Sequence, residues 1–306
     1  MSIVDSAAAS LGVSRDKILT LADQANHSYV TYSIPKKSGG EREIHHPSKP
    51  LKAVQRWFLR RWISLLPVSP LATAYEPGSS VLKNALVHEG AKYAVRIDLQ
   101  DFYWSISSDD FRSYLATVPA GAEIDFGDVE TVAALLFRHG RLTVGSPTSP
   151  SLSNRMCRKL DTECEALAVK IDARYSRYAD DMYFSATHPG ILSAIESSLE
   201  SILSGLDTPG SLRINKSKTQ HFSQKTGIFV TGLVIGSDGK VYLGRRRKRE
   251  IRALIHNLES LDLDARRRLA GKISFARSIE PAFVNALIKK YTVGRFRSAS
   301  RPDSAG

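Results

Sequence analysis

The middle of the chain reads Arg177-Tyr178-Ala179-Asp180-Asp181-Met182-Tyr183, where two adjacent carboxylates interrupt an aromatic and apolar run typical of buried β-structure. Two like charges in a half-buried turn raise one pKa and cost stability unless a divalent cation lies against them. Mg²⁺ is the expected ion, because it prefers carboxylate oxygens and keeps positions open for phosphate oxygens. On its own the pair would also fit a polar turn between two strands. The surrounding sequence is therefore needed to distinguish a metal site from such a turn.

The composition is that of a globular protein with a polyanionic partner. The 306 residues are 42% hydrophobic, which allows a sizeable core in one large domain or in several subdomains. Lysine and arginine number 43 against 31 aspartate and glutamate, a net charge of +12. From Arg245 onward there are 16 basic and 6 acidic residues, so this last stretch carries +10 of the total. A basic module on a near-neutral body indicates contact with nucleic acid.

Several classes of protein are not expected from this sequence. No run of 18 apolar residues is present, which argues against a membrane span, and the first residues do not resemble a signal peptide. Cys157 and Cys164 lie seven apart on one predicted helix, so their Cα atoms should be about 10 Å apart. That distance is too long for a disulfide, and we expect small buried core residues in a cytoplasmic protein.

Apolar periodicity and turn residues predict an α+β fold. Tyr93, Val95 and Ile97 alternate on one face of a strand that ends at Asp98. The strand and the hairpin around residues 180–181 should pair in one antiparallel sheet. The other expected elements are helix 13–26 capped by Ser14, two short strands within 34–44, and helices 51–66, 150–170 and 190–206. They are followed by a ribbon over 227–243 and helices over 245–261 and 264–291.

This order brings Asp98 beside Asp180 and Asp181. Three carboxylates from neighbouring strands can hold two Mg²⁺ ions about 3.5 to 4 Å apart, the arrangement that serves in-line phosphoryl displacement. One ion would lower the pKa of an attacking hydroxyl, and the other would accompany the pyrophosphate leaving group. The expected activity is nucleotidyl transfer, with Asp98, Leu99, Asp180 and Asp181 around the metal ions.

The same residues lie in motifs that resemble those of reverse transcriptases. Residues 96–103 (RIDLQDFY) resemble the first palm motif, 145–154 (GSPTSPSLSN) the GxPxSPxLxN motif, and 178–181 (YADD) the YxDD box. Residues 42–55 are similar to the fingers motif, and 215–219 (NKSKT) to the NxxKT segment. The elements NALVH at 84–88 and VTG at 230–232 resemble those that mark retron reverse transcriptases. Val144 replaces the glutamine usual before the glycine, a change that concerns template grip and not the metal site.

The resemblance, which covers roughly residues 30 to 260, implies roles for individual residues. Tyr103 would lie under the incoming sugar and exclude a 2′-hydroxyl, although it would also fit as a core aromatic. Lys218 would protonate the departing pyrophosphate. The catalytic set is then Asp98, Asp180, Asp181 and Lys218, and the nucleotide-binding set is Arg42, Tyr103, Gly145 and Pro147. The expected nucleic-acid contacts are Asn84, His88, Val230, Thr231, Gly232, Arg245, Arg246, Arg247, Lys248 and Arg249.

Each of these sets has a simpler alternative. Arg42 and the basic run from Arg245 to Arg249 would also fit as solvated surface charge. Asn84 and His88 are four apart on one predicted helical face, and a hydrogen-bonded core histidine is the common explanation of such a pair.

The resemblance implies a right-hand polymerase with fingers, an antiparallel-sheet palm and a short helical basic thumb. The expected divisions are an N-terminal helical segment (1–30), fingers (31–92), palm (93–117 and 145–235), a helical insertion (118–144) and the thumb (236–306). Such an enzyme would copy a structured non-coding RNA from an internal 2′-hydroxyl into a branched RNA–DNA product. It would use dNTPs and two Mg²⁺ ions, work beside a separate RNase H and an effector protein, and act in defence against phage.

Two alternatives remain open at the level of sequence. The same chemistry would suit a group II intron or diversity-generating reverse transcriptase, against which the NALVH and VTG elements count. A catalytically inactive palm that only binds RNA is the other, and the intact Asp98, Asp180 and Asp181 argue against it.

Overall fold

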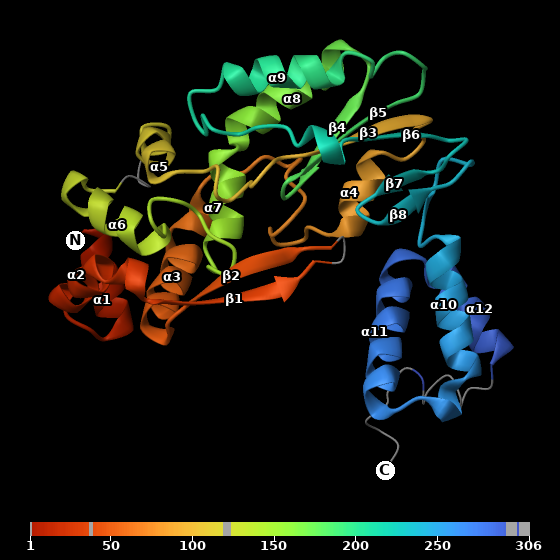
Figure 1. The fold of residues 1–306 in the computed structure, drawn as a ribbon, viewed down its shortest axis with the longest axis horizontal. Coiled ribbons are helices and arrows are strands. Elements are labelled where there is room, and N and C mark those ends of the chain that lie inside the picture. Colours follow the sequence, from red (N-terminus) through yellow and green to blue (C-terminus); the bar gives the residue numbers. More distant parts are fainter. Residues whose placement is uncertain (1, 37–38, 119–123, 292–298, 300–306) are drawn as a thin grey trace.

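A four-stranded antiparallel sheet in the order β4-β5-β3-β6 forms the centre of the molecule. Its strands are β3 (Tyr93–Asp98), β4 (Arg174–Tyr178), β5 (Asp181–Ala186) and β6 (Gln220–Ser223). The computed structural model in Figure 1 describes residues 2–36, 39–118, 124–291 and 299. The sheet confirms the predicted pairing of the strand 93–98 with the hairpin around 180–181.

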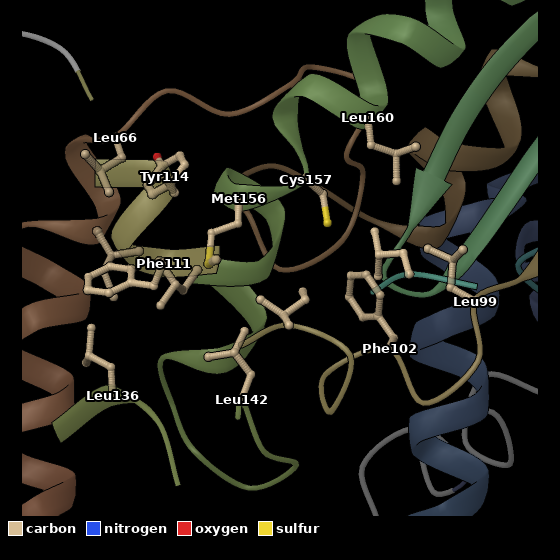
Figure 2. Packing of buried hydrophobic residues seen from close by; sticks show 14 of the residues in the cluster. Leu66, Leu99, Phe102, Phe111, Tyr114, Leu136, Leu142, Met156, Cys157 and Leu160 are labelled. Atoms are coloured by element: carbon tan, nitrogen blue, oxygen red, sulfur yellow. The ribbon is translucent and has the colours of Figure 1, made fainter. Parts of the chain in front are cut away.

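One face of this sheet packs on helices. Because side chains alternate along a strand, Val95 and Ile97 of β3 share a face with Phe184 of β5. They belong to the main apolar cluster together with residues of α8 (Arg158–Lys170) and α9 (Ile195–Ser204), which cover this face in Figure 1. Figure 2 shows Leu99 in the same cluster as Leu160, so the residue after Asp98 is anchored in the core.

The opposite face carries the polar residues of β3 and a smaller apolar cluster. Ala94 and Tyr183 pack there against α4 (Val81–Val87) and the strands β7 (Ile228–Val230) and β8 (Leu233–Ile235). Strand β9 (Val241–Tyr242) completes this three-stranded sheet. Arg96 and Asp98 follow Ala94 at spacings of two, so they lie on this second face.

The N-terminal residues, together with helices from residues 108–136, form a helical layer and a long hairpin. Their elements are α1 (Ile3–Leu11), α2 (Arg15–Asp23), η1 (Ala25–His27), β1 (Tyr29–Pro35), β2 (Glu41–Pro47), α3 (Lys49–Arg61), η2 (Ile63–Leu65), α5 (Ser108–Leu115), η3 (Phe126–Asp128) and α6 (Val129–Leu136). The Ser14 side chain accepts a hydrogen bond from the Lys17 backbone N–H, which confirms the predicted helix start. Strands β1 and β2 pair as expected, but they span 29–35 and 41–47 and so reach well beyond the expected range 34–44.

Two predicted helices are each divided in the structure. The helix expected over 150–170 is α7 (Ser149–Met156) followed by α8, with the break at Cys157. Nearly every residue of α7 is buried, so α7 runs through the core, whereas α8 lies along the sheet. The helix expected over 264–291 is α11 (Leu263–Ile279) and α12 (Pro281–Lys290), because Pro281 cannot continue the preceding helix.

The C-terminal helices have an apolar core of their own. Helices α10 (Arg245–His256), α11 and α12 bury Ile255, Leu269 and Val284 against one another, and η5 (Leu258–Ser260) follows α10. In Figure 1 these helices stand apart from the main body below β7 and β8. The remainder of the predicted thumb, after residue 291, lies outside the described residues apart from residue 299.

Two simpler predictions can also be compared with the fold. Cys157 and Cys164 are both buried and unpaired, as expected from their spacing, and burial raises the pKa of the Cys157 thiol to about 12. Within the described ranges, none of the helices combines the length and apolar character needed to cross a bilayer.

Candidate active site

The sheet brings the predicted carboxylates to one edge. Asp98, the last residue of β3, is the register partner of Asp181, the first residue of β5. The Leu99 backbone N–H donates to the Asp180 carbonyl at 2.9 Å, which joins the end of β3 to the turn. Ala179 lies between the two strands of the hairpin with φ of +60°, in the left-handed region that tightens the turn. The three carboxylates therefore occupy adjacent positions, as the sequence predicted.

Burial strongly affects the charge of the tandem pair. It raises the pKa of Asp180, and the nearby negative charge of Asp98 raises it further. Burial also raises the pKa of Asp181 to about 6, against the opposing effect of Arg96. The negative charge of both groups is thus incompletely compensated by the protein.

Two cationic side chains contact the carboxylates of Asp98 and Asp181. Arg96 donates from Nε to Asp181 Oδ1 at 2.8 Å, and Lys218 Nζ lies 2.9 and 3.2 Å from the two oxygens of Asp98. Lys218 belongs to η4 (Lys216–Lys218), and the Asn215 N–H before it donates to the Asp98 carbonyl at 2.8 Å. Lys218, predicted as catalytic, therefore lies against the candidate metal site.

The donor chemistry of this edge fits a hard divalent cation. It offers the carboxylate groups of Asp180 and Asp181. Their raised pKa values show that burying their negative charge without a positive counter-charge is unfavourable. Over the described part of the chain, no three Asp, Glu, His or Cys side chains are arranged closely enough to enclose a metal ion. In this arrangement Asp181 is turned toward Arg96 and Asp98 toward Lys218.

A tyrosine pair and an arginine border the carboxylates. Tyr103 is partly buried, and its pKa is raised by burial and then by the neighbouring Tyr75. Burial likewise raises the pKa of Tyr75, with Asp180 acting in the same sense and Arg42 in the opposite one. Tyr75 therefore lies beside Tyr103, and Asp180 and Arg42 are close enough to Tyr75 to affect its pKa. Tyr75 was not predicted, because its backbone φ of +64° and its half-exposed ring leave no pattern in the sequence.

The glycine-containing loop before α7 is packed against the N-terminal hairpin. Gly145 has φ of +114°, and a Cβ at this position would lie 2.4 Å from the His45 carbonyl oxygen. The His45 N–H donates to the Val144 carbonyl at 2.8 Å, so β2 and the loop are joined through their backbones. This close backbone contact is sufficient to explain why a glycine is needed at position 145, without any ligand. Pro147, two residues later, is partly buried.

Three of the predicted nucleic-acid contacts are wrong, because Asn84, His88 and Val230 are completely buried. His88 Nδ1 lies 2.7 Å from Ser185 Oγ, and its Nε2 lies 2.8 Å from Ser176 Oγ. Asn84 accepts from that same Ser176 hydroxyl at 2.7 Å. Burial lowers the pKa of His88 to about 3, so the ring is neutral and holds α4 on the sheet. The spacing of four correctly places both residues on one face, but that face points inward.

Other predicted contacts remain on or near the surface. Thr231 is partly buried; its N–H donates to the Tyr183 hydroxyl at 3.1 Å, and Gly232 next to it is exposed. Within the basic run, Arg247 donates to the Gly232 carbonyl and Lys248 pairs with Glu280, so both have structural partners. The exposed members of the run are Arg245, Arg246 and Arg249.

Arg96 is a second residue of the site that the sequence reasoning missed as a charge partner. Its position two residues before Asp98 places it on the same face of β3, and its register partner is Tyr183. It reaches Asp181 diagonally across the strands. The period of two along β3 was a signal that could have predicted this contact.

A sheet edge that carries these carboxylates, with helices behind it and a basic helical module after it, is the palm of a right-hand polymerase. Residues 34–252 match the family model described as reverse transcriptase (RNA-dependent DNA polymerase). The chain belongs to this family and is an RNA-directed DNA polymerase of retron type. Its template is therefore RNA, and Mg²⁺ is the ion that the family generally uses.

Curated relatives support this assignment over most of the chain. The chain is 30% identical over 304 residues to the retron Ec83 reverse transcriptase of Escherichia coli, covering 94% of this chain and 95% of the relative. It is 32% identical over 272 residues to the retron Ec73 enzyme of the same species, covering 85% and 86%. The retron Mx162 enzyme of Myxococcus xanthus is 31% identical over 338 residues, covering 97% and 68%.

A solved structure supports the fold. The apo telomerase of Candida tropicalis has a TM-score of 0.50 to this chain at 12% identity, covering 89% of this chain. The chain spans 60% of the length of that telomerase chain. This likeness concerns the right-hand polymerase fold alone.

Proposed function

We propose that this reverse transcriptase copies part of a structured non-coding RNA into DNA with two Mg²⁺ ions between Asp98, Asp180 and Asp181, next to Leu99. The register of the sheet supports this most directly, because it pairs Asp98 with Asp181 across β3 and β5. The raised pKa values of Asp180 and Asp181 are a second support, since a bound cation would relieve the unfavourable burial of negative charge.

The chain's own side chains would orient the reactants. When bound, the ions would lower the pKa of the attacking hydroxyl and neutralise the triphosphate. Lys218 would give a proton to the departing pyrophosphate, and its contact with Asp98 at 2.9 Å supports this role. Arg42 would contact the triphosphate from β2. The Tyr103 ring would meet a ribose 2′-hydroxyl and so favour deoxynucleotides.

Surfaces around the site would hold the nucleic acid. The loop of Gly145 and Pro147, which leads into α7, would contact the template or the incoming nucleotide. Thr231 and Gly232 would contact the primer end beside the palm. Arg245, Arg246 and Arg249 would follow the duplex by its phosphates, since they are the exposed cations of the basic run.

The setting is that of a retron system. Synthesis would start from an internal 2′-hydroxyl of the RNA and give a branched RNA–DNA product (msDNA). We assign the fingers to residues 31–92, the palm to 93–117 and 145–235, and the thumb to 236–306, with helical parts at 1–30 and 118–144. A separate RNase H would trim the template, and an effector protein would act with the enzyme in the cytoplasm in defence against phage. The retron relatives support this setting.

The decisive experiment compares nucleic acid that copurifies with the wild-type chain and with the double variant Asp180→Ala, Asp181→Ala. The wild type should carry a DNA-containing branched species that is shortened by RNase, and the variant should carry none. Equal amounts of this species from both proteins would refute the assignment of the metal site. RNA binding in the variant without DNA would show that the palm carboxylates serve synthesis and not RNA capture.

A further inference from the structure

A buried polar network lies directly behind the Asp180–Asp181 turn. Its centre is Arg177 of β4, whose side chain is fully buried on the sheet face that packs against α7 and α8. The guanidinium donates from Nε and Nη2 to the two oxygens of Asp161 at 2.8 and 2.7 Å. Tyr175, two residues earlier on the same face, donates its hydroxyl to Asp161 at 2.8 Å.

The remaining donor of Arg177 is directed at the turn. Nη1 donates to the Ala179 carbonyl at 3.0 Å, the residue that stands in the left-handed region immediately before Asp180. The same nitrogen donates to Asn154 Oδ1 at 3.1 Å. A buried ion pair contributes little net stability, because removing two charges from water opposes their attraction. The buried Arg177 is therefore better explained by its orienting of the Asp180–Asp181 turn than by a contribution to the stability of the fold.

Asn154 links the Asp180–Asp181 turn to the segment 74–76, which carries Tyr75. Its Nδ2 donates to the Ala74 carbonyl at 2.8 Å and lies 3.2 Å from Glu76 Oε1, so one amide holds the residues on both sides of Tyr75. Glu76 is fixed further by Arg155, which donates to its two oxygens at 2.7 and 3.1 Å. Tyr75 itself has φ of +64°, a conformation that its neighbours must hold in place.

Asn154 thus contacts two segments that are far apart in sequence and that also pair through their backbones, where the Thr73 N–H donates to the Arg177 carbonyl at 2.8 Å. We infer that Asn154 and Arg177 are positioning residues: together they fix the Asp180–Asp181 turn relative to residues 74–76, which hold Tyr75 beside Tyr103. Metal binding and nucleotide selection would then both depend on these two buried side chains. The inference rests on the proposed metal role of Asp180 and Asp181 and adds the groups that orient them. Neither residue touches the substrate, because both side chains are buried.

The test uses Asn154→Leu, which keeps a similar volume without polar atoms, and Arg177→Lys, which keeps the charge without the guanidinium fork. Mn²⁺ binding to the purified full chain, measured by electron paramagnetic resonance, reports on the turn without any catalysis. The ratio of kcat/KM for dNTP and rNTP reports on Tyr103, the proposed sugar-selecting residue, which lies beside Tyr75. Loss of a group that orients a metal ligand typically weakens metal affinity by about 10-fold to 100-fold, and we expect a loss in that range for both variants. Asn154→Leu should also lower the dNTP/rNTP ratio.

Asp128→Asn serves as the matched control. Asp128 is buried and accepts from Arg15 at 2.5 Å and from the Val4 N–H at 3.0 Å, in the N-terminal helical layer. This variant should lower the melting temperature without changing Mn²⁺ affinity or the dNTP/rNTP ratio. All proteins are measured well below their melting temperatures, and Arg177→Lys carries the test if Asn154→Leu does not fold.

Three further outcomes distinguish this inference from general destabilisation and from the proposed function. If Asp180→Asn weakens Mn²⁺ binding but Arg177→Lys and Asn154→Leu bind like the wild type, the positioning role is refuted and the metal site stands. If Asp128→Asn weakens binding as much as they do, general destabilisation explains the effect and the positioning role is again refuted. If Asp180→Asn itself binds Mn²⁺ like the wild type, the proposed metal site fails and the inference fails with it.

Discussion

Replacing Gly145 with alanine should separate β2 from the loop that precedes α7. The new Cβ would lie 2.4 Å from the His45 carbonyl oxygen and 2.9 Å from its carbon, so the two backbones have to move apart. The φ of +114° adds strain of about 1 to 3 kcal/mol for a residue with a side chain. Loss of the hydrogen bond from His45 to Val144 adds about 1 kcal/mol.

The free energy of unfolding should therefore fall by about 2 to 4 kcal/mol. For a chain of this size, that corresponds to a melting temperature lower by about 3 to 6 °C. Because β2 also carries Arg42, its displacement should raise the KM for dNTP more than it lowers kcat. Thermal unfolding followed by circular dichroism and steady-state primer extension would measure the two effects.

Gly12→Ala is the matched control. Gly12 also has positive φ, +66°, but nothing lies within 4 Å of the position its Cβ would take. It should show a strain cost of about 1 kcal/mol and no change in KM. If Gly145→Ala and Gly12→Ala have equal melting temperatures and equal KM values, the backbone contact between β2 and the loop does not constrain the site.

Three further predictions concern other parts of the molecule. His88 has a folded pKa near 3, well below its ordinary value, so the unfolded chain binds more protons and stability is lost as the pH falls from about 6.5 toward 3. Urea unfolding should show about 2 kcal/mol of this loss between pH 7.5 and 5, and His88→Gln, which does not titrate, should lack it; an equal loss in the variant would contradict the assignment. Tyr103→Val should lower the dNTP/rNTP ratio of kcat/KM by about tenfold or more, whereas unchanged selectivity would refute its role beside the sugar. Changing Arg245, Arg246 and Arg249 to glutamine should reduce the slope of log K for RNA against log salt by about 2, and an unchanged slope would assign them to solvated surface.

The strands and the carboxylate site were predictable because their determinants are local. The alternation from Tyr93 to Asp98 defines which side chains share a face, and the turn between β4 and β5 holds residues 180–181 at the start of β5, which pairs with β3 across a long stretch of sequence. The helix breaks at Cys157 and before Pro281 were missed for different reasons. Pro281 is a sequence signal from which a helix break could have been predicted. The break at Cys157 has no such signal and follows from the way α7 passes through the core.

The environment of individual side chains was less predictable. The spacing of Asn84 and His88 identifies a common helical face, but only the packing of α4 on β4 and β5 shows that this face is buried. Arg177 stands in the same motif as Asp180 and Asp181, yet its partners Asp161 and Asn154 are 16 and 23 residues away on α8 and α7. No periodicity connects residues at such separations.

The sequence by itself therefore determined the chemistry of this protein: the tandem Asp180-Asp181, the strand ending at Asp98, the order of the surrounding motifs and the basic C-terminal stretch. These depend on residue types and on short spacings, which backbone geometry converts directly into shared faces and edges. Only the tertiary structure decided which charges pair, which polar residues are buried and that Tyr75 stands beside Tyr103. Burial and ion pairing depend on segments brought together by folding, so their partners are set by the packing of the whole chain.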